Sequence, residues 1–172
     1  MSAGGCAIIP RMGDWLDERV KQFLDQKEAE QLARRSAAEL ETHKTEVLRL
    51  KARGLLDALT ARVKNDFERY DEHFRNEPER HVSFAAKPSG GFQLSKNHYP
   101  TVKMESSLAD ESRTIRAEYI MMLSAAGTPH HLTVDVILDV DGHDNLSMHV
   151  GKQRVETLED LSRILIERVL FA

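Results

Sequence analysis

The fold of this chain is decided by residues 48–74, LRLKARGLLDALTARVKNDFERYDEHF. Their apolar side chains recur in steps of three, four or seven residues, which is the spacing of one face of an α-helix. The stripe consists of Leu48, Leu55, Leu59, Val63, Phe67, Tyr70 and Phe74. It crosses Gly54 without a change of phase, which favours one continuous helix. A kink at Gly54, or a hairpin that reverses near residues 42–45, is left open by this pattern.

The helical pattern extends outward from this stripe in both directions. It begins at Asp14, a candidate N-cap, and it ends at Asn76, two residues before Pro78. Between these limits the chain has no proline and is rich in strong helix formers. We therefore predict a long helical arm or coiled-coil segment over residues 14–77, preceded by a flexible N-terminus over residues 1–13.

The first part of this helix is poor in apolar side chains. Between Asp25 and Glu46 it carries two leucines and four alanines, a stripe too narrow to be buried in a globular core. Small residues recur on one heptad seam, which is formed by Ala33, Ala37, Leu40, Val47, Gly54, Ala58 and Ala61. Because small residues let helices approach closely, we predict that this seam pairs with another helix. A solvated, salt-bridged helix is the alternative.

After Pro78 the apolar residues alternate with polar ones, which indicates β-strands. The alternating segments are residues 82–86, 92–94, 102–104, 115–123, 132–140 and 146–150. They predict an antiparallel meander of five or six strands with one apolar face. Thr157 then opens a last helix, which is apolar almost all round near its end and so requires cover on two sides or a second subunit. The chain is thus expected to be α+β, with a sheet domain over residues 78–172 whose C-terminal helix packs on the sheet.

Charge and composition exclude several classes of protein. The chain has 24 basic and 28 acidic residues, and the basic middle of the long helix has acidic flanks and no interleaved aromatic pair, so we expect no nucleic-acid binding. One cysteine excludes a disulfide framework and a cysteine-based zinc site. No segment approaches the roughly 18 consecutive apolar residues of a membrane span, and residues 1–10 lack the basic region and the long apolar region that are typical of a signal peptide. We therefore expect no membrane association and a cytoplasmic location.

Motifs of catalysis and metal binding are missing from the sequence. It contains no phosphate loop, dinucleotide fingerprint, nucleophile elbow or zinc-protease motif. Residues 139–145 resemble a calcium loop, but the glycine is fourth rather than sixth and no glutamate closes the loop, so a polar hairpin turn is favoured. We expect no catalytic residue, no cofactor and no metal site.

One histidine requires a geometric test. Matching apolar faces across the last hairpin places His149 opposite Ile137 and diagonal to Asp135 and Asp139, with Arg116 and Glu118 on the neighbouring strand. A histidine among carboxylates could bind a metal or transfer protons. A solvent-facing ladder of opposite charges is the favoured interpretation.

These observations favour a non-catalytic protein–protein interaction or assembly module, which forms a homo-oligomer, a dimer being favoured, and is open to other protein partners. The candidate interface residues are Leu40, Val47, Leu48, Ile120, Met122, Ile137, Ile166 and Leu170. Alternation places Ile120, Met122 and Ile137 on the polar side of the sheet. If Ile120 and Ile137 are neighbours, they form an apolar island that the long helix or a second subunit must cover.

The alternative function is a small hydrophobic-ligand-binding domain, or an enzyme, that uses the apolar sheet face. Its pocket would be lined by Met104, Met121, Met122 and Met148. Methionine adapts to irregular apolar ligands, but it also fills cores.

Overall fold

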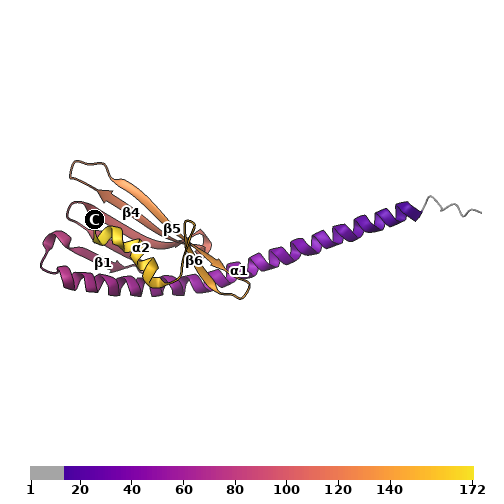
Figure 1. The fold of residues 1–172 in the computed structure, drawn as a ribbon, viewed down its shortest axis with the longest axis horizontal. Helices are drawn as coiled ribbons and strands as arrows, with labels where there is room; N and C mark the ends of the chain where they lie inside the picture. The colour runs from indigo at the N-terminus through magenta and orange to yellow at the C-terminus, as the bar shows by residue number, and fades with distance from the viewer. Residues whose placement is uncertain (1–13) are drawn as a thin grey trace, which may run out of the picture. The chain divides into compact units, whose positions relative to one another are not determined.

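The computed structural model describes residues 14–172, which adopt an α+β fold (Figure 1). Helix α1 spans Asp14–Phe74 as one element, so the alternative hairpin near residues 42–45 is wrong. Gly54 lies inside α1, and a Cβ added there would meet no atom within 4 Å. The predicted flexible N-terminus, residues 1–13, lies outside the described residues.

Seven strands and a second helix follow α1, with a short 3-10 helix at Pro78–Arg80 and another at Asp110–Ser112. The strands are β1 (Val82–Ala86), β2 (Phe92–Lys96), β3 (Thr101–Ala109), β4 (Thr114–Met122), β5 (His130–Val140), β6 (Leu146–Val150) and β7 (Gln153–Val155). Helix α2 spans Leu158–Leu170. The strands form one antiparallel sheet in the order of the sequence, which confirms the predicted meander. Strand β7 was not predicted, because three residues are too few to show an alternation.

The chain divides into two units, whose boundary lies between His43 and Lys44. Residues 44–74 of α1 belong to the same compact unit as the sheet and α2, whereas the sequence pattern placed the whole helix in a separate segment that ended at residue 77. The reason is tertiary packing. Val47 and Leu48 are already part of the buried core of the compact unit.

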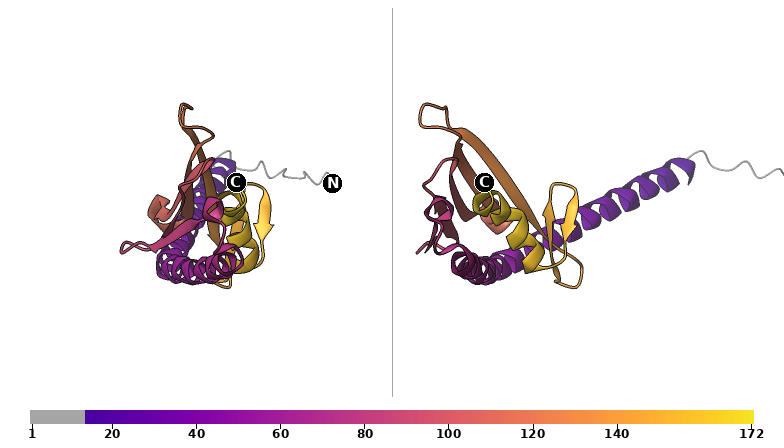
Figure 2. Two further views of the ribbon diagram at one scale, coloured as in Figure 1. Left: turned by 90° about the vertical axis from the view of Figure 1, so that its left-hand side faces the viewer. Right: turned by 60° about the vertical axis from the view of Figure 1, so that its left-hand side comes forward.

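The core of the compact unit lies between one face of the sheet and the two helices (Figure 2). Helix α1 contributes Leu56, Leu59 and Val63, each at most 1% exposed. The sheet contributes the alternating apolar residues, and its buried side chains include Val82, Phe92, Leu94, Val102, Met104, Ile115, Tyr119, Val136, Leu138 and Val140. Burial of each large apolar side chain stabilises the fold by about 1.5–3 kcal/mol.

Helix α2 is covered on two sides, which explains its unusually apolar end. Toward the sheet, the hydroxyl of Tyr119 donates a hydrogen bond of 2.7 Å to the carbonyl oxygen of Leu165. Toward α1, the hydroxyl of Ser162 donates a hydrogen bond of 2.7 Å to the carboxylate of Asp66. The helix begins as the sequence predicts, because the Thr157 side chain accepts a hydrogen bond of 3.0 Å from the backbone N–H of Asp160.

Candidate functional site

Residues 15–43 of α1, here called the exposed stretch, belong to the first of the two units. Every side chain in it is exposed. Large apolar side chains are among them, and Phe23 is 66% exposed. Packing of an apolar stripe normally supplies most of the stability of a helix in a protein. In this stretch the large apolar side chains are exposed and do not supply that packing.

One face of this stretch carries a continuous row of side chains, in steps of four and three residues. It consists of Leu16, Val20, Phe23, Lys27, Glu30, Arg34 and Ala37, here called the 16–37 face. Phe23, Lys27, Glu30 and Arg34 line one shallow groove of about 340 Å³ on the helix surface. The row is apolar in its first two turns and charged in the next two. The sequence pattern favoured the alanine seam instead, although the spacing of this row was available as a signal.

The charged members of the 16–37 face have few contacts of their own. The amide of Gln26 donates a hydrogen bond of 3.3 Å to the carboxylate of Glu30. Between residues that the structure describes, Lys27 and Arg34 form no ion pair. These two cations can therefore bind an anionic group of a partner without breaking an existing ion pair.

Five of the eight predicted interface residues lie on the two helices. Leu40 lies in the exposed stretch and is 50% exposed. Val47, Leu48, Ile166 and Leu170 are buried in the core of their own chain, where they already pack against other elements. These four side chains are not available to a partner while the compact unit is folded.

The expected apolar island on the polar sheet face does not form. Ile120 lies opposite His131, whereas Ile137 lies opposite Thr114, so the two isoleucines are separated by six residues along β4. Their side chains are 40% and 49% exposed, respectively. Met122 is partly buried opposite Thr101. The proposed cover by the long helix is also wrong, because residues 44–74 of α1 pack on the opposite face of the sheet.

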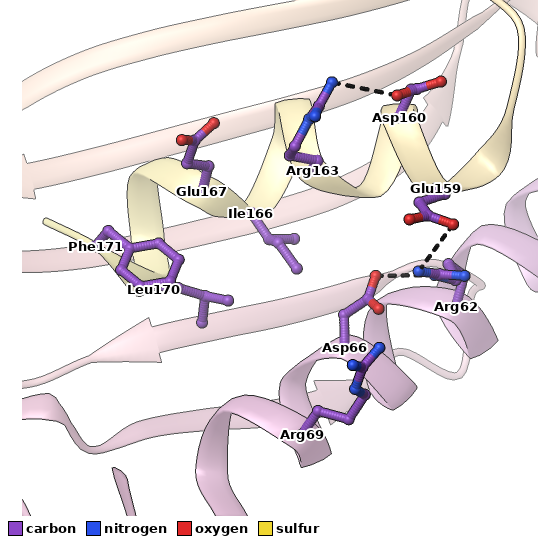
Figure 3. Close-up of a pocket in the computed structure, with 10 residues that line it drawn as sticks. All are labelled: Arg62, Asp66, Arg69, Glu159, Asp160, Arg163, Ile166, Glu167, Leu170 and Phe171. Atoms are coloured by element: carbon purple, nitrogen blue, oxygen red, sulfur yellow. Dashed lines mark hydrogen bonds and ion pairs between the residues drawn. The ribbon is translucent and has the colours of Figure 1, made fainter. Parts of the chain in front are cut away.

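A cleft between α1 and α2 lies in the compact unit and has a volume of about 340 Å³ (Figure 3). Asp66 organises its α1 wall, because its carboxylate accepts hydrogen bonds from Arg62 at 3.0 Å and from Ser162 at 2.7 Å. The hydrogen bond that Arg62 donates to Asp66 raises the pKa of Arg62. Arg62 also lies 3.5 Å from Glu159 on α2. These contacts join the two helices.

The rest of the cleft combines charge with an apolar floor. Ile166 and Leu170 are buried at its base, and Phe171 closes one end, where its ring meets the ring of Tyr70 edge-on at 5.7 Å. Arg163 pairs with Asp160 on the same helix at 3.2 Å. Most of the charged groups are thus paired, which is the arrangement of a structural joint between two helices.

The outer face of the sheet carries the predicted charge ladder. The register places Ile137 opposite His149, as the alternation predicts, and it places Arg116 of the neighbouring strand opposite Asp135. The guanidinium of Arg116 donates two hydrogen bonds to Asp135, at 2.9 and 3.3 Å. Asp135 raises the pKa of Arg116 through this bond, and Asp110 contributes a weaker attraction at 3.5 Å. His149 lies 3.4 Å from the hydroxyl of Ser147.

Residues 141–145 form a turn that is closed by its own hydrogen bonds. The carboxylate of Asp141 accepts bonds from the Asn145 side chain at 3.0 Å and from the backbone N–H groups of Asn145 and His143, at 2.9 and 2.8 Å. These bonds stabilise the charged form and lower the pKa of Asp141 to about 2. These hydrogen bonds close the polar turn that the sequence predicts for this segment.

The four methionines of the alternative function do not share one lining. Met104 and Met148 are buried in the core, whereas Met121 and Met122 are consecutive in β4 and point to opposite faces of the sheet. No described helix has an apolar stretch of the length needed to cross a bilayer. Comparison of the chain with protein-family models, with characterised proteins and with solved structures found no match.

Proposed function

We propose that the chain is a non-catalytic protein–protein interaction module that self-associates, as a dimer, through the exposed stretch of α1. One observation carries this proposal: residues 15–43 form a helix in which every side chain is exposed. The cytoplasm is the proposed compartment, because a single cysteine suits a reducing environment.

The energetics of an isolated helix support the proposal. Fixing the backbone of each residue costs about 1–2 kcal/mol, and hydrogen bonds along the helix recover only part of that cost. In residues 44–74 the recovery comes from the buried stripe, but residues 15–43 have no such contribution within the described chain. Burial of Val20 and Phe23 against a partner would supply it.

A helical pair is long enough to be specific. Residues 16–37 cover three heptads, which is about the shortest length that sustains a coiled coil. We propose a second copy of the chain as the partner, because most oligomers of soluble proteins are symmetric assemblies of one chain. The ligand-binding alternative is less favoured, because the methionines expected to line its pocket are divided between the core and the outer face.

Light scattering coupled to size exclusion tests this proposal. At micromolar concentration we expect the intact chain to have twice the 19.5 kDa mass of one copy. The double variant Val20→Asp/Phe23→Asp should have the mass of one copy and an unchanged circular dichroism transition for the compact unit.

Leu32→Asp is the matched control. Leu32 is 70% exposed, slightly more than Phe23, and lies nine residues from it, about half a turn away around the helix. It should leave the mass unchanged. A single-copy mass for the wild-type chain would reject self-association, and an equal effect of both changes would reject the 16–37 face.

A further inference from the structure

We infer that the 16–37 face binds the same face of a second copy in the antiparallel direction, about an axis that passes between Lys27 and Glu30. The inference rests on the proposed self-association and adds the direction and register of the pair. Charge complementarity along the face is the observation that carries it.

A parallel pair in register would place every residue of the face opposite its own copy. Lys27 would then lie opposite Lys27, Glu30 opposite Glu30 and Arg34 opposite Arg34. Between described residues, no ion pair of the chain itself neutralises Lys27 or Arg34. At each of these three positions two like charges would face and repel each other. Only the apolar residues of the first two turns of the face would make attractive contacts.

In the antiparallel pair each of these charged residues faces a different residue of the second copy. Lys27 of each copy lies opposite Glu30 of the other, which gives two ion pairs at the centre of the interface. The same register places Arg34 against Phe23 of the second copy, where a guanidinium can stack on an aromatic ring. Phe23 is 66% exposed, and Arg34 lies in the same groove on the helix surface, so both are accessible.

Toward the two ends of the antiparallel pair, the facing side chains allow the two helices to pack closely. Val20 lies opposite Ala37, whose small side chain lets the helix axes approach. Leu16 lies opposite Glu41 at the end of the pair, where both side chains reach water. The three repulsive contacts of the parallel arrangement are thus replaced by two Lys27–Glu30 ion pairs and two Arg34–Phe23 contacts, and no like charges face each other.

Disulfide formation distinguishes the two directions. In a Cys6→Ser background, two single variants are prepared, Val20→Cys and Ala37→Cys. Positions 20 and 37 are 17 residues apart, which is about 26 Å along a helix, and a disulfide needs Cα atoms within about 7 Å. The antiparallel pair predicts that oxidation links the two variants when they are mixed and links neither variant alone.

Charge exchange gives a second measurement. Lys27→Glu places its new carboxylate opposite Glu30 in the antiparallel pair, so the dissociation constant should rise about tenfold or more. The double variant Lys27→Glu/Glu30→Lys should restore it. Lys21→Glu is the control, because Lys21 lies away from the 16–37 face, and it should leave the constant unchanged. A parallel pair predicts little change for Lys27→Glu, because one like-charged layer replaces another.

The outcomes separate the two proposals. Disulfides within each single variant would overturn the antiparallel direction while the dimer stands. A dimeric mass without any disulfide would place the interface elsewhere on the chain and would overturn the register. A single-copy mass for the wild-type chain would overturn both the antiparallel pair and the proposed function.

Discussion

The two stretches of α1, residues 15–43 and 44–74, have similar compositions and different surroundings. Both are rich in strong helix formers, and both are helical. In the second stretch Leu56, Leu59 and Val63 are at most 1% exposed, whereas no side chain of the first stretch is buried. Helix propensity therefore accounts for the secondary structure of both stretches, and the density of the apolar stripe decides which of them joins a core.

The two stretches also differ in the ion pairs that their charged side chains form. Residues 44–74 contain i,i+4 ion pairs, such as Arg53 with Asp57 at 3.4 Å and Lys64 with Glu68 at 3.6 Å. Between described residues, the charged side chains of residues 15–40 form no ion pair. Ion pairs within the helix are thus found in the second stretch and, among the described residues, not in residues 15–40 of the first.

The largest expected effect tests the contrast in burial. Leu59→Ala removes a fully buried side chain and should lower the free energy of unfolding by about 2–5 kcal/mol. Leu32→Ala, in the exposed stretch, should change it by less than about 0.5 kcal/mol. Urea denaturation followed by circular dichroism measures both values. Equal losses for the two variants would show that the stretches do not differ as described.

A smaller effect tests the joint between α1 and α2. Asp66→Ala removes the acceptor of the buried Ser162 hydroxyl, so the free energy of unfolding should fall by about 1–3 kcal/mol. Asp57→Ala is the matched control, because its ion pair with Arg53 is largely exposed. That change should cost less than about 1 kcal/mol. If the two changes lower the free energy of unfolding equally, the hydrogen bond from Ser162 to Asp66 does not stabilise the contact between α1 and α2.

The smallest effect concerns the turn at residues 141–145. The hydrogen bonds from Asn145 and His143 lower the pKa of Asp141 to about 2, below its ordinary value of 3.8. A lowered pKa stabilises the folded state above the ordinary value, and this contribution is lost as the pH falls from about 4 to about 2. Asn145→Ala should move the pKa of Asp141 toward 3.8, as measured by NMR titration. Signals of residues 15–43 should not respond to this change; an unshifted Asp141 would contradict the assigned cause.

Periodicity predicted most of the compact unit. The helix begins at Asp14 as predicted and ends at Phe74, three residues before the predicted limit of 77, and the pairing of Ile137 with His149 followed from alternation alone. Local patterns suffice where apolar side chains recur at the period of the element that buries them.

Other features depended on tertiary structure. Alternation assigns Ile120 and Ile137 to one face of the sheet, but their separation depends on the register between β4 and β5, which the loop between those strands determines. Val47 and Leu48 have the same local pattern as interface residues, and only the packing of the sheet shows that they belong to the core. The charged half of the 16–37 face was missed because the prediction relied on small and apolar residues.

The central claim is that residues 15–43 are stabilised by a second copy and residues 44–74 by their own sheet. Hydrogen exchange of the intact chain, followed by mass spectrometry at two protein concentrations, tests it most directly. We expect protection of residues 15–43 to rise with concentration across the dissociation constant, while protection of residues 47–74 stays the same. Protection of residues 15–43 that is independent of concentration would contradict the claim.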